Sequence, residues 1–383
     1  MSGSLLRWAC AATVASMLAA PGPATAATAP APGPLPAAGS KSVATLLTDL
    51  QRLYQEAEKA TETYNATAEK LKKRRTTAGD LARKLSTART SLHDSRDAAG
   101  RLAREQYQGS SNFSPYVRLL LARDPQHALD QGHVIRRVAQ ERIATVERLV
   151  GGEKRADDLA AQARKALAEQ TRLSDRQKKD RDAVRARLKD VEKLLASLSP
   201  DQIAELTRLE ATGMAKAQKT FMASGALSSR RAPSRAGDAA LAYAVQQIGK
   251  PYVWGAEGPA AFDCSGLTSK AWEHAGENIP RTSQEQWARL PRVPLNELRP
   301  GDLVVYFPEA THVAMYLGDG MVVQAPRPGA KVKVSPIAAN PLLGAVRPDQ
   351  GATSMKDYTP PELPESATGS DDTGYGAAGA PTG

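Results

Sequence analysis

Cysteine is nearly absent from this sequence. Only two of the 383 residues are cysteines, Cys10 and Cys264. Exported proteins usually pair their cysteines, so a single thiol left in such a protein needs a reason. Histidine is scarce too, and residues 238–350 hold only His274 and His312 beside Cys264, without the spacing of metal ligands. We therefore predict neither a metal site nor a cofactor.

Aromatic residues are also few, and the charge is unbalanced. Aromatic side chains make up 5 % of the chain, which is low for one large packed core but fits long helices rich in alanine, leucine and charge. The formal net charge is +10, and the basic excess lies in residues 41–234. A basic surface favours nucleic acid, anionic lipid or anionic cell-wall polymer. Acidic residues interleave with the basic ones and no aromatic platform accompanies them, so we predict no nucleic-acid binding.

No apolar run in the sequence is long enough to span a membrane. The run at residues 8–20 follows Arg7 and ends at the prolines and small residues of 21–26. This pattern is typical of a secretory signal peptide, here residues 1–26, and an N-terminal anchor is the alternative. Removal of the peptide would take Cys10 with it. The sequence therefore predicts a secreted, extracytoplasmic protein.

A heptad pattern dominates the next part of the chain. Residues 27–40 are rich in alanine, proline and glycine and are predicted to be a flexible linker. Hydrophobic residues then recur in alternating steps of four and three from Leu46 to Leu102. The pattern breaks at 109–133 and resumes beyond it, so we predict an antiparallel coiled-coil hairpin over 41–224 with an apolar tip at 109–133. The tip is either a docking site or a cap on the hairpin's own core.

The C-terminal part reads as a smaller α+β unit between two irregular segments. We predict a linker at 225–237 and a disordered tail at 351–383, because both are rich in loop-forming residues and lack periodicity. Within 238–350, Asp238 and Asp263 each resemble the N-cap of a helix. Buried strands are predicted in three stretches: 303–307, 312–317 and 321–325.

Cys264 stands in the first turn of the second of these helices. The unpaired N–H groups and the dipole there favour an anion, so we expect a lowered thiol pKa. The thiol could be an inert buried residue, half of an intermolecular disulfide, or a nucleophile, and a nucleophile needs a base. His274 lies ten residues along the same helix, roughly 15 Å away, and cannot reach the sulfur. His312 is left as the base, and Gln324 at the end of a neighbouring strand could hold its ring.

Five motifs in order resemble the NlpC/p60 cysteine peptidases. The resemblance covers roughly residues 238–350 and is carried by these segments: Tyr252-Val253-Trp254-Gly255, Phe262-Asp263-Cys264-Ser265-Gly266-Leu267, Pro280-Arg281-Thr282-Ser283, Pro300-Gly301-Asp302-Leu303 and His312-Val313-Ala314-Met315-Tyr316-Leu317-Gly318. It implies a papain-like α+β fold in which N-terminal helices pack on an antiparallel sheet. It also implies hydrolysis of peptide bonds in peptidoglycan stems, usually between D-glutamate and the diamino acid.

The resemblance assigns roles to four catalytic positions. By position, Cys264 is the nucleophile and His312 is the base. Gln324 takes the third polar position, which is more often histidine in the family. Tyr252 would offer its hydroxyl to the oxyanion, with the N–H of Cys264 as the second donor.

The same resemblance assigns three residues to the substrate groove, namely Asp263, Ser265 and Arg281. Two other readings stay open: an N-acetylmuramoyl-L-alanine amidase with the same chemistry, and a non-catalytic coiled-coil scaffold. In some family members such a coiled coil docks on a membrane ABC-type complex at the division site, and the hairpin with its tip resembles that arrangement. The expected partners are therefore peptidoglycan stem peptides, an anionic wall polymer held by the basic hairpin, and such a complex.

Overall fold

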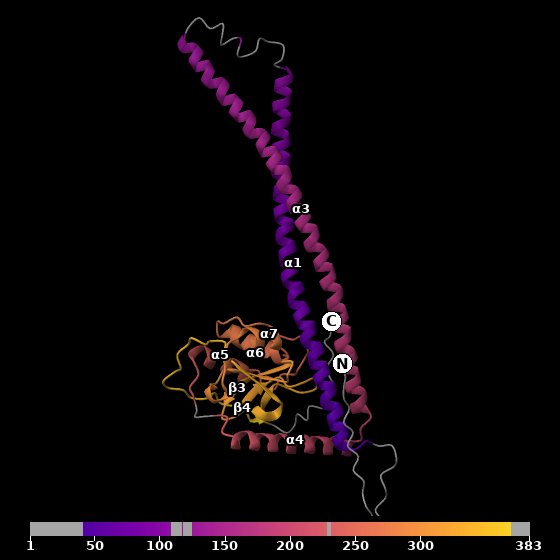
Figure 1. Ribbon diagram of the computed structural model, residues 1–383. Coiled ribbons are helices and arrows are strands. Elements are labelled where there is room, and N and C mark those ends of the chain that lie inside the picture. Colours follow the sequence, from indigo (N-terminus) through magenta and orange to yellow (C-terminus); the bar gives the residue numbers. More distant parts are fainter. Residues whose placement is uncertain (1–40, 109–116, 118–124, 228–230, 369–383) are drawn as a thin grey trace, which may run out of the picture. The chain divides into compact units, whose positions relative to one another are not determined.

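Two long helices form the first part of the chain in a computed structural model (Figure 1). The structure describes residues 41–108, 117, 125–227 and 231–368. Helix α1 spans Val43–Gln108 and helix α3 spans Pro125–Ala196. The predicted signal peptide, the first linker and most of the predicted apolar tip lie outside the described residues.

Helices α1 and α3 pair in antiparallel register. As residue numbers rise along α1, those of the α3 partners fall, in these pairs: Arg187 with Glu56 at 3.2 Å, Thr67 with Asp180 at 2.6 Å, Arg74 with Glu169 at 2.9 Å and Arg96 with Glu153 at 3.1 Å. Leu50, Tyr54 and Val191 form an apolar cluster near the end of the pair that α4 follows. The predicted antiparallel hairpin of long helices is thus confirmed.

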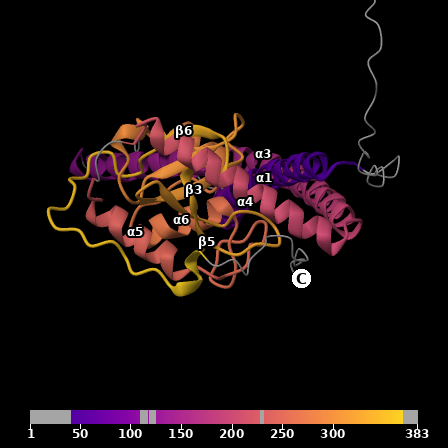
Figure 2. The same cartoon turned by 90° about the horizontal axis from the view of Figure 1, so that it is seen from below.

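Helix α4 (Pro200–Ala223) turns the chain from this pair towards the sheet. Its start is fixed by a capping box, in which the Ser199 hydroxyl accepts from the N–H of Gln202 and the Gln202 side chain accepts from the N–H of Ser199. Gln218 of α4 donates to the carbonyl of Gly320 at 2.9 Å. Figure 2 shows α4 crossing in front of the sheet.

A six-stranded antiparallel sheet is the centre of the C-terminal unit. Its strand order is β1-β6-β2-β3-β4-β5. The strands are β1 (Arg292–Val293), β2 (Leu303–Tyr306), β3 (His312–Gly318), β4 (Met321–Gln324), β5 (Lys333–Pro336) and β6 (Leu342–Val346). The helices are α5 (Arg235–Gln246), α6 (Cys264–His274) and α7 (Ser283–Arg289), with short 3₁₀ turns η2 (Leu295–Glu297), η3 (Ile337–Ala339) and η4 (Glu365–Thr368).

Both faces of the sheet are covered, which explains why β2 is a continuous apolar run. Leu303 and Val305 face a cluster shared with α5 and α6, whereas Val304 and Tyr306 face a cluster that includes Phe221 of α4. All four β2 residues are therefore buried. In Figure 1 helices α5, α6 and α7 lie on one side of the sheet and α4 on the other. The α+β class and the helices packed on an antiparallel sheet are confirmed.

Two local boundaries differ from the sequence-based predictions. Helix α5 begins at Arg235 because Ser234, not Asp238, is its N-cap and accepts from the N–H of Gly237. The segment 351–368 was predicted to be disordered, yet the N–H of Met355 donates to the Pro233 carbonyl and Ala367 is buried. The rest of the predicted tail lies outside the described residues.

Helix α1 buries more than its heptad seam. Four polar residues away from that seam are also inaccessible to solvent: Glu58, Thr61, Glu62 and Asn65. They cover the C-terminal unit, in the same compact body of residues 42–383. Across the described ranges, no helix combines the length and apolarity that crossing a membrane requires.

Candidate active site

Cys264 is the first residue of α6, and its neighbours fix its position. The Asp263 carboxylate caps the helix by accepting from the N–H of Gly266 at 2.7 Å. A side chain at Gly266 would place Cβ 2.2 Å from the carbonyl oxygen of Ala256, so only glycine allows this close approach. Cys264 is 2 % exposed, and its sulfur lies within hydrogen-bonding reach of the backbone N–H of Val313. The predicted N-cap is confirmed, and the thiol lies against the start of β3.

His312 opens β3 and is completely buried. Its Nε2 pairs with Oε1 of Gln324, at the end of β4, at 2.6 Å. Because an amide oxygen can only accept, this pairing places the ring proton on Nε2 and leaves a lone pair on Nδ1. Nδ1 has no hydrogen-bond partner among the described residues. Gln324 therefore orients the ring and leaves its basic nitrogen, Nδ1, without a hydrogen bond. The next residue along β3 is Val313, whose backbone N–H lies within reach of the Cys264 sulfur.

Tyr252 is 4 % exposed and lies in the loop before α6. Burial, and after it the nearby Cys264, raise the pKa of its hydroxyl well above the usual range. The group is therefore a neutral donor at physiological pH. Such a hydroxyl beside the thiol has the chemistry of an oxyanion donor.

Asp263, Ser265 and Arg281 form one buried network. Arg281 donates from Nη2 to Asp263 Oδ2 at 2.7 Å, and from Nη1 to Asp263 Oδ1 at 3.0 Å. Nη1 also donates to Ser265 Oγ at 2.8 Å, and Nε donates to Glu257 at 2.8 Å. Nearby Asp263 raises the pKa of Arg281 against the effect of its burial. The guanidinium is therefore committed to two carboxylates and holds Ser265 in place.

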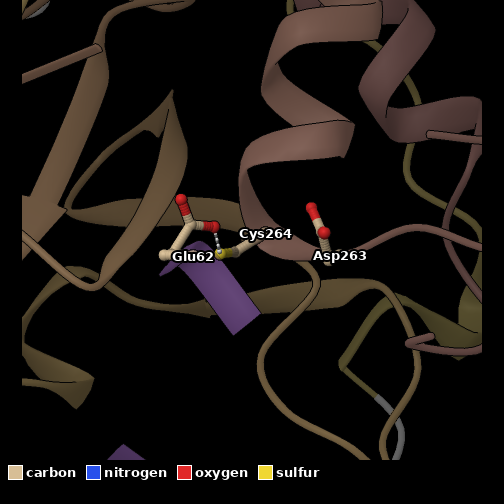
Figure 3. Close-up of side chains that lie close together, drawn as sticks. All are labelled: Glu62, Asp263 and Cys264. Atoms are coloured by element: carbon tan, nitrogen blue, oxygen red, sulfur yellow. Dashed lines mark hydrogen bonds between the residues drawn. The ribbon is translucent and has the colours of Figure 1, made fainter. Parts of the chain in front are cut away.

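Two glutamates of α1 enter this site. Figure 3 shows the Glu62 carboxylate directed at the sulfur of Cys264, while Asp263 points elsewhere. Glu62 Oε1 accepts from Cys264 Sγ at 3.8 Å and from Ser265 Oγ at 2.8 Å. Its Oε2 accepts from the N–H of Ser283 at 2.8 Å. Glu58 Oε1 lies 3.6 Å from Nδ1 of His312.

A third residue of α1, Asn65, contacts the site on the same helix face. Its Nδ2 donates to Asp263 Oδ2 at 3.0 Å. Tyr64 packs edge-on against Trp254 with ring centroids 5.1 Å apart, in the loop that also carries Tyr252. Glu58, Glu62 and Asn65 thus lie at positions i, i+4 and i+7, which is one face of a helix.

The titration of the site follows from its burial. Burial and then Glu62, Asp263 and Glu58 raise the pKa of Cys264 well above its usual range. The expected lowering of this pKa is therefore wrong for the chain in this conformation, because desolvation and three carboxylates outweigh the helix dipole. Burial also lowers the pKa of His312 to about 4, despite the hydrogen bond that its ring donates to Gln324. The site holds a neutral thiol beside a neutral imidazole.

Glu62 itself is strongly perturbed. Burial and the nearby Asp263 raise its pKa to about 7, whereas Arg281 and the hydrogen bonds from Ser265 and Ser283 act in the opposite direction. Burial raises the pKa of Glu58 well above its usual range as well. Both carboxyl groups therefore bind protons more tightly in this site than in water.

The geometry does not favour a metal. Ligand atoms of Glu62, Asp263 and Cys264 lie within 4.8 Å of one another. Asp263, however, already accepts from Arg281, from the N–H groups of Gly255 and Gly266, and from Asn65. A carboxylate held by this many donors has no lone pair directed at an ion.

Comparison with known proteins identifies the C-terminal unit. Residues 249–344 match the model of the NlpC/P60 family. These residues are an NlpC/P60 domain. The match extends over the loop of Tyr252, helix α6, strands β1 to β5 and the start of β6, and so includes every predicted site residue.

Curated relatives agree with the domain match. A protein of Corynebacterium glutamicum described as a "Probable endopeptidase" is 44 % identical over 111 residues, 29 % of this chain and 53 % of that protein. A "Probable endopeptidase" of Mycobacterium tuberculosis is 38 % identical over 105 residues, 27 % of each chain. The alignment thus spans about half of the corynebacterial relative and about a quarter of the mycobacterial one.

A solved structure of the same family was also found. The NlpC/p60 domain of the peptidoglycan hydrolase SagA is 34 % identical, covering 29 % of this chain and 97 % of that domain, with a TM-score of 0.28. Like the relatives above, it matches a limited part of this chain.

The α1 residues of the site were not found from the sequence. The heptad pattern assigned α1 to the hairpin alone, and Glu58, Glu62 and Asn65 fall between its seam positions as ordinary surface residues. No local signal distinguishes a glutamate that faces water from one that faces a distant domain. The backbone N–H of Ser283 donates to Glu62. Ser283 is the last residue of the Pro280-Arg281-Thr282-Ser283 motif, but the sequence analysis assigned it no role in the site.

Proposed function

We propose that this chain is a secreted, wall-associated cysteine endopeptidase that cleaves peptidoglycan stem peptides between D-glutamate and the diamino acid. One observation carries the proposal. Cys264 stands at the start of α6 against the N–H of Val313, next to His312, whose ring Gln324 orients at 2.6 Å. A lone thiol, an oriented imidazole and a polar third residue make up the machinery of thiol-dependent acyl transfer.

The mechanism follows from the protonation states. Nδ1 of His312 takes the thiol proton as the sulfur of Cys264 attacks the scissile carbonyl carbon. The oxyanion is stabilised by the Tyr252 hydroxyl and the N–H of Cys264. The imidazolium protonates the leaving amine, a thioester remains on Cys264, and water activated by His312 hydrolyses it to the free acid.

The cell-wall location and partners belong to the same proposal. The apolar run at residues 8–20 supports export, and the names of the curated relatives support a peptidase. Docking on a membrane complex remains a proposal for residues 109–133. Its support among the described residues is the exposed apolar side chains of α3 beyond the tip: Val134, Val138, Ile143, Val146 and Val150.

Mutation of the thiol tests the proposed chemistry. We expect purified peptidoglycan treated with the chain to release fragments cut at the glutamyl–diamino acid bond, and Cys264→Ala to release none. Mass spectrometry of the soluble fraction reads the result. Ser269→Ala, on the same helix, is the matched control and should keep the activity. Unchanged release by Cys264→Ala, or release of intact stem peptides, would contradict the proposal.

A further inference from the structure

Arg327 lies in a turn between the residue that holds the base and the proposed oxyanion donor. It follows Gln324, whose side chain orients His312, by a stretch of chain that spans at most about 11 Å. The N–H of Ala330 closes the turn by donating to the carbonyl of Arg327 at 3.1 Å, and the N–H of Tyr252 donates to the carbonyl of Ala330 at 2.9 Å. The side chain of Arg327 therefore starts from the edge of the candidate active site.

The backbone on both sides of Arg327 is restricted by proline. Pro326 precedes it and Pro328 follows it. Proline fixes its own φ angle and also disfavours the helical conformation in the residue before it. A restricted turn loses little conformational entropy when its side chain binds a ligand. The sequence around Arg327 thus presents the guanidinium group from a preorganised position.

The guanidinium group of Arg327 already binds a carboxylate through two parallel hydrogen bonds. Nη1 donates to Glu210 Oε1 at 2.6 Å, and Nη2 donates to Glu210 Oε2 at 2.9 Å. The two side chains are only 18 % and 15 % exposed, and the guanidinium group lies over the ring of Tyr54, 4.8 Å from its centroid. Arginine recognises carboxylates selectively with this forked geometry. The surroundings of Arg327 therefore suit a carboxylate that is partly shielded from water.

The position of Arg327 relative to the base decides which part of a substrate it meets. In the proposed mechanism His312 protonates the leaving amine, which belongs to the diamino acid, so this amino acid lies on the His312 side of the thiol. Glu58 Oε1 lies 3.6 Å from His312 Nδ1. Burial raises the pKa of Glu58, and the charge of nearby Arg327 opposes that rise. Arg327 and the diamino acid are therefore on the same side of the site.

We propose that Arg327 is a specificity-determining residue that binds a carboxylate on the side chain of the diamino acid. The substrate carboxylate takes the place of the Glu210 carboxylate on the same two N–H groups. Arg327 thus selects a diamino acid with a second carboxylate, such as diaminopimelate, and repels the ammonium group of lysine. The inference rests on the proposed function, because the cleaved bond decides which amino acid lies beside His312.

Binding of two matched peptides tests this recognition without relying on cleavage. The full chain with Cys264→Ala, here the parent chain, is titrated with L-Ala-γ-D-Glu-diaminopimelate and with its lysine analogue. Both peptides are amidated at the C-terminus, so they differ only in the side-chain carboxylate, and calorimetry gives a Kd for each. We expect the parent chain to prefer the diaminopimelate peptide. Adding Arg327→Gln should reduce the preference about tenfold or more, the factor that corresponds to one charge-assisted hydrogen bond.

Two further variants separate recognition from structural support. Glu210→Gln is the matched control, because it removes the same ion pair but leaves the guanidinium group, and it should keep the preference of the parent chain. Arg327→Lys keeps the charge without the fork and should keep only part of the preference, which provides the test if Arg327→Gln does not fold. An equal loss of preference in Glu210→Gln and Arg327→Gln would overturn the inference, since loss of the ion pair alone would then explain the effect.

The remaining outcomes distinguish this inference from the proposed function. Equal affinity of the parent chain for the two peptides, or no binding of the diaminopimelate peptide, would overturn the role of Arg327 even if the wild type cleaved peptidoglycan. A preference that depends on Arg327, without cleavage of either peptide by the wild type, would support the role of Arg327 and contradict the endopeptidase.

Discussion

A single thiol in this chain has its reactivity set by residues about two hundred positions away. At the start of a helix, Cys264 would be expected to ionise readily. Burial of the thiol opposes this most strongly, and the nearby Glu62, Asp263 and Glu58 act in the same direction, so the pKa of Cys264 is raised. His312 is kept neutral by the same burial, with its pKa lowered to about 4. The reactive state therefore depends on which side chains surround the thiol, and the helix position is only one contribution.

The perturbed carboxyl of Glu62 predicts a pH-dependent stability. Its pKa is raised to about 7 in the folded chain, so its contribution is complete below about 4.3, the pKa of an unperturbed glutamate, and is lost as pH rises through 7. Thermal unfolding should show the advantage of the wild type over Glu62→Ala at pH 5 shrinking by pH 8. The charged and titratable groups that surround position 62 are Glu58, Asp263, Cys264 and Arg281.

Glu56→Ala is the control for this pH effect. Glu56 is on the same helix and outside the site, so its substitution should change stability by a similar amount at both pH values. A difference between wild type and Glu62→Ala that did not vary with pH would contradict the raised pKa.

Among the elements, α6 is the one on which the site depends most directly. Its N-cap Asp263 fixes where the helix begins, and Gly266 lets the first turn approach the carbonyl of Ala256. The first turn cannot move without moving Cys264, because the thiol belongs to it. Packing of the first turn of α6 against the loop that contains Ala256 therefore sets the position of the Cys264 sulfur.

Replacement of Gly266 tests that packing. Its new Cβ would lie 2.2 Å from the Ala256 carbonyl oxygen, and overpacking of this kind destabilises by about 1–3 kcal/mol. We expect Gly266→Ala to lower the Tm by several degrees and to reduce cleavage. Gly213→Ala in α4, with no atom within 4 Å, is the control and should raise stability slightly. Equal Tm values for Gly266→Ala and the wild type would contradict the packing argument.

Local signals explain which elements could be predicted from the sequence. The start of α6 followed from an aspartate cap, and β2 followed from a short apolar run between turns. The start of α5 did not, because Ser234 and Asp238 are both good caps and only tertiary packing chooses between them. Glu58 and Glu62 could not be assigned to the site, because contact between α1 and a domain about two hundred residues away leaves no periodic mark.

The whole molecule combines a nearly neutral catalytic unit with basic helices. The two parts divide the work in our account: the NlpC/P60 domain carries the chemistry, and α1 both pairs with α3 and covers the thiol.

The basic helices predict salt-sensitive attachment to the wall. We expect Cys264→Ala, which leaves the wall intact, to bind purified walls at low salt and to be released steeply as salt rises past about 0.1 M, where the Debye length is about 10 Å. Walls stripped of anionic polymer are the control and should bind little at any salt. Binding that does not change with salt would contradict an electrostatic attachment.

Mass spectrometry of one defined stem peptide tests the central claim most directly. The full chain is compared as the wild type, as Cys264→Ala and as Ser269→Ala. Our account predicts cleavage between D-glutamate and the diamino acid by the wild type and by Ser269→Ala, and none by Cys264→Ala. Cleavage that persists in Cys264→Ala, or cleavage only at another bond, would contradict it.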